Sequence, residues 1–265
     1  MPRAMGPREE DEVPPHVSPQ RRVRLNMRTS PTFHRFNDLT ITRANVEYQI
    51  HTSRTDGEAA PTEIFQAARD HNVSAIAFTE HVRADSAWFP DFVAEVERVS
   101  RMFPDVRVSI GCEAKALDYE GTLDASEDAI QLSDIVLGSV HRFPDGKGGY
   151  IPFASLSADE LAHKECALSV GLLRAAPIDV LAHPGGMYQR RFGPYPERLL
   201  RKIMEVSLER GVAVEINSSY AEDLTSLLNL CSQINPYVSI GSDVHSLKDL
   251  GRCRDSLMPL SMGAE

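Results

Sequence analysis

The chain has 265 residues, of which 42% are hydrophobic, and its formal net charge is −10. This length can bury a full core in one domain, and the acidic balance argues against a general binder of nucleic-acid phosphates, which would carry a basic stripe. No apolar run could span a bilayer, no secretory signal opens the chain, and the four cysteines form no C-x-x-C pair, so we expect a cytoplasmic protein with reduced cysteines.

The first part of the chain differs in composition from the rest. Residues 1–31 are rich in Pro, Arg and Glu and show no apolar periodicity, which is typical of a disordered tail. Strand-like and helix-like patterns begin only after this segment. The sequence therefore predicts a disordered tail over 1–31 and one folded domain over 32–265.

Seven short β-branched or apolar runs predict strands at 46–50, 74–78, 106–110, 135–137, 180–182, 212–216 and 238–240. Amphipathic stretches between them predict helices at 61–71, 92–102, 157–173, 196–210 (ended by Gly211) and 224–234. This alternation is typical of a parallel β/α fold. Polar side chains follow nearly every strand, which favours a barrel, with its site at the carboxyl ends of the strands, over an open sheet.

The residues after these strands are the kinds that bind divalent metals. Imidazoles or carboxylates follow nearly every strand: His51, Asp56, His81, Glu113, His141, His183, Asp243 and His245. One histidine of this kind would more often be a hydrogen-bonded structural residue. Five imidazoles and three carboxylates that converge at one mouth predict a metal cluster.

The motifs that carry these residues resemble those of the polymerase and histidinol phosphatase (PHP) superfamily. They run from about Val46 to His245 and read His51-Thr52 with Asp56-Gly57, Thr79-Glu80-His81, Glu113, Ser139-Val140-His141, His183-Pro184 and Ser242-Asp243-Val244-His245. The resemblance implies a distorted seven-stranded (β/α)7 barrel of the TIM-like kind. It also implies two to three divalent ions (zinc, manganese or iron, with magnesium also compatible) and hydrolysis of phosphoesters.

One position departs from the family pattern. The first motif of the family is His-x-His, whereas this chain has Gln49-Ile50-His51. A carboxamide oxygen is a weak ligand for zinc, although manganese or magnesium tolerates it. The first site is therefore either weaker and selective for a harder ion, or lost.

The resemblance also implies how the ligands divide among three ions. Glu113 would bridge two of them, and Glu113, His183, Asp243 and Arg142 would be the catalytic residues. The first ion would be held by Gln49, His51, Glu113 and Asp243, the second by Glu113, His141 and His183, and the third by Asp56, His81 and His245.

Arginines near the predicted mouth could bind a substrate phosphate through two parallel hydrogen bonds. We expect Arg142 and one or both of Arg190 and Arg191 to do so. The glycines at 146–149 lack the spacing of a phosphate-binding P-loop, and we expect a mobile loop there.

The sequence thus favours a phosphomonoesterase that uses a metal-bridging hydroxide on a small phosphorylated metabolite. Two alternatives remain: a nuclease or phosphodiesterase, and a catalytically weakened barrel that binds a phosphorylated ligand or a protein partner. The substrate, the native metal and the oligomeric state are left open.

Overall fold

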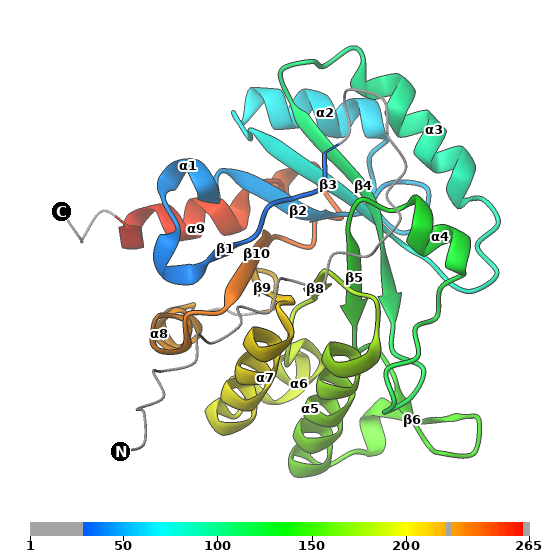
Figure 1. Ribbon diagram of the computed structural model, residues 1–265, viewed down its shortest axis with the longest axis vertical. Helices are drawn as coiled ribbons and strands as arrows, with labels where there is room; N and C mark the ends of the chain where they lie inside the picture. Colours follow the sequence, from blue (N-terminus) through cyan, green and yellow to red (C-terminus); the bar gives the residue numbers. More distant parts are fainter. Residues whose placement is uncertain (1–28, 221–223, 262–265) are drawn as a thin grey trace, which may run out of the picture.

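A mostly parallel sheet forms the centre of the molecule (Figure 1). The computed structural model describes residues 29–220 and 224–261. Within them, eight strands pair in the order β1-β10-β9-β8-β5-β4-β3-β2, and all neighbours are parallel except β1 and β10. The strands are β1 (His34–Arg35), β2 (Val46–Ile50), β3 (Ala75–His81), β4 (Arg107–Lys115), β5 (Val136–Ser139), β8 (Val180–Leu181), β9 (Ala213–Asn217) and β10 (Tyr237–Gly241).

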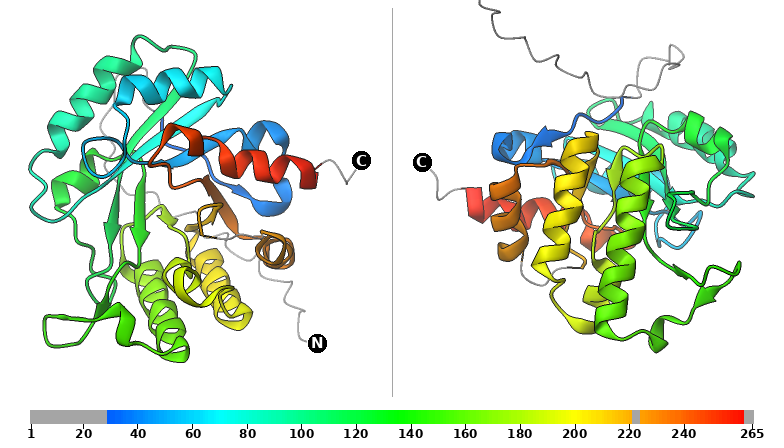
Figure 2. Two further views of the ribbon diagram at one scale, coloured as in Figure 1. Left: turned by 180° about the vertical axis from the view of Figure 1, so that it is seen from behind. Right: turned by 60° about the horizontal axis from the view of Figure 1, so that its bottom comes forward.

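Helices lie around the outside of this sheet, and α5, α7 and α8 stand side by side along one flank (Figure 2). The predicted helices correspond to α2 (Pro61–Asp70), α3 (Phe89–Ser100), α5 (Ala158–Ala175), α7 (Glu197–Arg210) and α8 (Thr225–Ile234). Local chemistry sets their ends. Ser157 and Glu160 cap the start of α5 reciprocally, and Gly211 ends α7 with φ of 67°, as predicted.

Other elements were not predicted from the sequence. They are α1 (Ile41–Ala44), α4 (Glu127–Leu132), α6 (Gly186–Phe192), α9 (Arg252–Ser261), the 3-10 turns η1 (Phe36–Asp38), η2 (Phe153–Ser155) and η3 (Leu247–Asp249), strand β1 and the hairpin β6 (Phe143–Pro144)–β7 (Tyr150–Ile151). The glycine-rich loop connects β6 to β7. Asp145 closes this loop by accepting from the backbone N–H groups of Lys147 (2.7 Å) and Gly149 (2.9 Å). Its mobility stays a prediction.

The two ends of the parallel series come together beyond the end of β10. Ile50 of β2 forms a bridge with Val244. The Val244 N–H donates to the Gln49 carbonyl, and the His51 N–H donates to the Val244 carbonyl, both at 2.9 Å. The α/β class and the parallel sheet are confirmed. Among the described residues, one bridge joins β2 to the chain after β10, and the closed seven-stranded barrel stays a prediction.

Two sequence expectations concern the ends and the cysteines. The predicted tail lies outside the described residues up to position 28; Thr29, near its end, donates its N–H to the Val108 carbonyl of β4 at 3.2 Å. All four cysteines are buried and free of disulfides. Among the described residues, no helix combines the length and apolar composition needed to cross a bilayer.

Candidate metal centre

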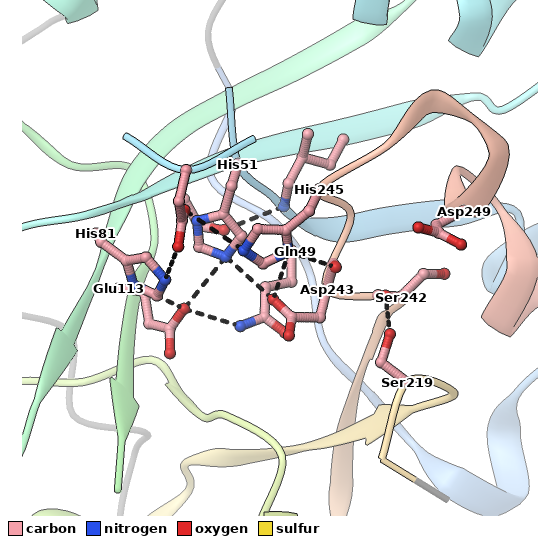
Figure 3. A network of polar contacts seen from close by, with 12 residues as sticks. Gln49, His51, His81, Glu113, Ser219, Ser242, Asp243, His245 and Asp249 are labelled. Atoms are coloured by element: carbon pink, nitrogen blue, oxygen red, sulfur yellow. Dashed lines mark hydrogen bonds and ion pairs between the residues drawn. The ribbon is translucent and has the colours of Figure 1, made fainter. Parts of the chain in front are cut away.

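The predicted ligands converge at the carboxyl ends of the parallel strands. Figure 3 shows Gln49, His51, His81, Glu113, Asp243 and His245 with their side chains directed toward a common centre. His81 is the last residue of β3, Glu113 lies two residues before the end of β4, and Asp243 follows β10. Because all these strands run the same way, residues far apart in sequence meet at one edge, as expected for a parallel sheet.

The buried carboxylate of Glu113 is at the middle of the cluster. Its Oε1 lies 3.2 Å from His183 Nε2 and 3.3 Å from His141 Nε2. Its Oε2 lies 3.3 Å from His51 Nε2 and 3.4 Å from His81 Nδ1. Burial would raise the pKa of Glu113, but the surrounding imidazoles, first those of His81 and His141, hold it well below its usual value. The carboxylate is therefore ionised and available as a ligand.

His51 gives the clearest sign that a cation belongs here. Its Nε2 lies 3.3 Å from Glu113 Oε2 and 3.2 Å from Asp243 Oδ1, yet both ring nitrogens are buried without a hydrogen-bond partner. A buried polar atom in this state costs about 1–3 kcal/mol. Burial lowers the pKa of His51, but Asp243 and Glu113 outweigh it and raise the pKa well above its usual value. A field that favours a proton on this nitrogen also favours a divalent cation, so these residues fit a metal.

A second set of ligands surrounds Asp56 in the loop after β2. Asp56 Oδ2 lies 3.5 Å from His81 Nε2, and its Oδ1 lies 3.4 Å from His245 Nε2. Hydrogen bonding to His81 lowers the pKa of Asp56, against the opposing effect of partial burial. Glu80 holds this loop in place, because it accepts from the Thr52 N–H at 2.8 Å and from the Thr55 hydroxyl.

The structure brings eight of the nine predicted ligands together: seven fall into three groups, and His183 joins them with its Nε2 3.2 Å from Glu113 Oε1. Three groups have ligand atoms within 4.8 Å of one another: His51, Asp56, His81 and His245; His81, Glu113 and His141; and His51, Glu113 and Asp243. His51 and His81 each occur in two groups, which differs from the division implied by the resemblance. How the ligands divide among the ions stays a prediction.

Gln49 is buried beside these groups but is engaged in hydrogen bonds. Its Nε2 donates to Glu113 Oε2 at 3.0 Å, and its Oε1 accepts from Asn217 Nδ2 at 2.8 Å. The oxygen that was predicted to bind the first ion thus faces Asn217.

The three predicted substrate arginines have different surroundings. Arg142 is exposed and lies over the Tyr150 ring at 5.2 Å. Arg190 reaches the cluster through Tyr220, whose hydroxyl it contacts at 2.6 Å. Arg191 donates to three carbonyls of the segment Phe153 to Leu156, at 2.7 to 2.9 Å. Those contacts give Arg191 a structural role in anchoring η2.

Tyr220 is a site residue that the sequence analysis missed. Its hydroxyl donates to Asp243 Oδ2 at 3.0 Å, and its ring stacks on His183 with centroids 4.4 Å apart. Burial and then the Asp243 carboxylate raise the pKa of Tyr220, so the phenol keeps its proton and donates. The rule that polar residues after a strand face the site could have identified it, because Tyr220 follows β9.

Two buried carboxyl groups, those of Glu47 and Glu215, position the backbone around the ligands. Glu47 accepts from the N–H of Ser242 at 2.6 Å, next to Asp243. Glu215 accepts from the N–H of His183 at 2.8 Å. The predicted ligands His183 and Asp243 both have a positive φ, 28° and 49° respectively. Glu215 and Glu47 therefore hold the backbone where it is strained.

A depression of about 510 Å³ opens beside the ligands of the Asp56 group. It is lined by Thr55, Asp56, His81, Arg83, Asp85, Ser86 and Trp88. Its charged side chains are of both signs, so it is not a basic groove.

Comparison with known proteins identifies the family. The model of the PHP domain matches residues 47–219. The chain belongs to the PHP family. The match ends before Asp243 and His245, which the structure nevertheless places with the other ligands. As a PHP protein, the chain is a hydrolase.

Relatives of this PHP protein carry the name probable phosphatase. This chain is 28% identical to a probable phosphatase from Caldicellulosiruptor bescii over 203 residues, and the alignment covers 72% of this chain and 75% of that protein. It is 26% identical over 216 residues to one from Proteus mirabilis, covering 78% and 80%. The fold is similar to that of a candidate histidinol phosphatase from Listeria monocytogenes, with a TM-score of 0.64, 16% identity, and coverage of 80% of this chain and 99% of that one.

Proposed function

We propose that this PHP protein is a metal-dependent phosphomonoesterase that acts on a small phosphorylated metabolite. Family membership and the probable phosphatases among its relatives support metal-dependent phosphoester hydrolysis. The observation that carries the proposal is the buried His51 Nε2, which lies between two carboxylates without a hydrogen-bond partner. The ligands would be His51, Asp56, His81, Glu113, His141, His183, Asp243 and His245.

The chain's own residues prepare this site for hydrolysis. Bound divalent ions neutralise charge on phosphoryl oxygens and make water acidic enough to act as a nucleophile near neutral pH. Glu113 is held ionised among its imidazoles, and Glu215 fixes the backbone of His183. Arg190, which contacts Tyr220 at the edge of the cluster, would bind a substrate phosphate, together with exposed Arg142, the residue after His141.

The surroundings of the ligands support a small substrate. The depression beside Asp56 combines Asp56 and Asp85 with Arg83 and the Trp88 ring, and the chain is acidic overall. A nucleic-acid backbone is typically bound along an extended basic surface, and the mixed charge of this depression does not form one. These features support a compact phosphomonoester over a polynucleotide.

We also infer that the sheet closes into a (β/α)7 barrel, with residues 32–265 as one domain. The bridge between Ile50 and Val244 supports closure, and α9 packs on both β2 and β10. Such closure would explain why His51, which follows β2, meets Asp243, which follows β10: His51 Nε2 lies 3.2 Å from Asp243 Oδ1.

The test begins with the metal content of protein purified without chelator, measured by plasma mass spectrometry. The protein is then stripped, reloaded separately with Mn²⁺, Zn²⁺, Fe²⁺ or Mg²⁺, and assayed with p-nitrophenyl phosphate, bis-p-nitrophenyl phosphate and a panel of phosphorylated metabolites. We expect metal-dependent cleavage of monoesters well above that of the diester. Preference for the diester would favour a nuclease, and bound metal without hydrolysis would favour a binding protein.

A matched pair of variants links activity to the cluster. His51→Asn removes the buried imidazole, whereas His163→Asn removes an exposed imidazole on α5 that contacts Asp159. We expect loss of metal and hydrolysis only in the first. Equal activity in the two variants would refute the assignment of the site.

A further inference from the structure

We propose that Gln49 is not a metal ligand but the middle link of a polarised hydrogen-bond chain that holds the Glu113 carboxylate. The chain runs from the Ser219 backbone N–H through the side chains of Asn217 and Gln49 to Glu113. This inference rests on the proposed function, because it concerns the same metal site, and it assigns a positioning role to the residue that departs from the family pattern.

The orientation of each amide follows from the fixed group at the start of the chain. The Ser219 N–H can only donate, so the oxygen of Asn217 must face it, and it does so at 2.8 Å. The amide nitrogen of Asn217 then points to Gln49 Oε1 at 2.8 Å and to Glu215 Oε2 at 3.1 Å. The Gln49 nitrogen is left for Glu113 Oε2, at 3.0 Å.

The opposite orientation of Gln49 is excluded by the same neighbours. Rotating its amide by 180° would set the Gln49 nitrogen against the Asn217 nitrogen, two donors, and the Gln49 oxygen against the ionised Glu113 oxygen, two acceptors. Gln49, Asn217 and Glu113 are each at most 3% exposed, so water cannot repair these mismatches. The amide assignment is therefore determined by the network.

The backbone is built to accommodate this arrangement. A Cβ atom at Gly241 would lie 2.1 Å from Glu215 Oε1 and 3.0 Å from the Gln49 Cβ. Glycine at this position of β10 thus leaves room for the side chains of Gln49 and Glu215. The Gln49 carbonyl also accepts from the Val244 N–H at 2.9 Å, so the residue connects β2 to the segment that carries Asp243.

The consequence concerns both the carboxylate and the ligand number. Donation by Gln49 to Glu113 Oε2 fixes the position of the oxygen that His51 and His81 approach. The group of His51, Glu113 and Asp243 is left with three ligand side chains, because Gln49 directs its nitrogen to the site. Three protein ligands are typical of catalytic metal sites, which keep a position open.

The decisive experiment is a crystal structure of the wild-type protein loaded with Mn²⁺. We expect Gln49 Oε1 to remain on Asn217 and its nitrogen on Glu113. An ion bonded directly to Gln49 Oε1 would overturn this inference and leave the proposed function intact. A crystal without any ion at millimolar Mn²⁺ would refute the proposed function, and this inference with it.

A solution experiment tests the coupling along the chain. Mn²⁺ affinity is measured by competition with a chromophoric chelator for Gln49→Met, Asn217→Leu, the double variant and the control Gln66→Met, which alters an exposed glutamine of α2 bonded to Asp70. Because residues that orient ligands typically contribute about 10- to 100-fold to metal affinity, we expect each single variant to weaken binding by that amount.

The double variant distinguishes a chain from independent effects. If Asn217 acts through Gln49, the double variant binds Mn²⁺ no more weakly than Gln49→Met, and the control is unchanged. Wild-type affinity in folded Asn217→Leu, or losses that multiply in the double variant, would overturn the chain. Circular dichroism checks the folding of each variant, and the wild-type crystal decides the question if Asn217→Leu does not fold.

Discussion

Replacing Tyr220 by Phe removes one hydroxyl and keeps the rest of the ring. The stack on His183, with centroids 4.4 Å apart, would persist. The hydrogen bond to Asp243 Oδ2 and the contact with Arg190 would both be lost. The substitution therefore asks what the hydroxyl contributes to holding Asp243, separately from packing.

The size of the effect follows from the charge of the acceptor. Burial opposes ionisation of Asp243, but the adjacent His51 imidazole, whose Nε2 lies 3.2 Å from Oδ1, lowers its pKa to about 2, so the carboxylate is charged at neutral pH. A hydrogen bond to a charged group is worth about 1.5–3 kcal/mol. Since about 1.4 kcal/mol is a factor of ten, we expect kcat/KM for p-nitrophenyl phosphate to fall about 10- to 100-fold in Tyr220→Phe.

Tyr195→Phe is the matched control. The Tyr195 side chain is also buried, but its hydroxyl donates to the Ala162 carbonyl of α5 at 2.7 Å, and α5 carries none of the predicted ligands. Its loss should cost about 1 kcal/mol of stability, read from urea denaturation, and leave kcat/KM unchanged. If the two Phe variants hydrolyse the substrate equally well, the contact between Tyr220 and Asp243 does not position the site, and the reasoning fails.

Three further predictions concern the ligands, the metal and pH. Asp243→Asn and His183→Asn should abolish hydrolysis with little unfolding, because Asn tolerates positive φ. His183→Ala should abolish hydrolysis and also lower the melting temperature. Near-normal turnover in either Asn variant would exclude that residue as a ligand. Chelation should lower the free energy of unfolding, and metal at 100 times its Kd should restore about 2.7 kcal/mol, seen by thermal denaturation; no shift would argue against a metal bound in the native state. Burial raises the pKa of Glu165 to about 7, although the N–H groups of Met187 and Tyr188 donate to its carboxylate. The native state therefore keeps this proton to a higher pH than the unfolded chain does. As a result, the free energy of unfolding decreases as pH rises from about 4.5 to 7. Glu165→Gln should flatten that slope in urea titrations, and an unchanged slope would contradict the prediction.

The positions of the parallel strands along the chain could be predicted because each one is a short apolar run between other elements. The predicted run at 212–216 became β9 (Ala213–Asn217), and the one at 46–50 became β2 without change. Helix α6 escaped prediction because it begins at Gly185 and Gly186, which are poor helix formers, and is stabilised by tertiary contacts. In the first turn of α6, the N–H groups of Met187 and Tyr188 donate to Glu165 of α5. Glu165 lies 22 residues before Met187 in the chain.

The convergence of the ligands could be predicted for a geometric reason, and their hydrogen bonds could not. Side chains after parallel strands must share one edge, so His51, Glu113 and Asp243 were expected to meet. The bond between Gln49 and Asn217 joins residues 168 positions apart, and it depends on the register of β2, β9 and β10 and on the rotamers of two amides. Resemblance to the family indicated that position 49 was unusual, but it gave no sign that the Gln49 oxygen would accept from Asn217; whether Gln49 binds an ion stays a prediction.

The buried acids in the middle of strands explain how strained ligands are kept in place. Glu47 of β2 and Glu215 of β9 are both at most 2% exposed, which is costly for a carboxylate unless its oxygens are bonded. Glu47 Oε1 accepts from the N–H of Ser242, next to Asp243, and Glu215 Oε2 accepts from the N–H of His183; both His183 and Asp243 have positive φ. Such φ values cost of order 1–3 kcal/mol each. Burial raises the pKa of Glu47 to about 7 and that of Glu215 to about 8, and hydrogen bonds to these carboxyl groups, each worth about 0.5–1.5 kcal/mol net, offset part of that cost. Carboxylates that interrupt an apolar strand therefore indicate, in this fold, where the backbone must be held for its ligands.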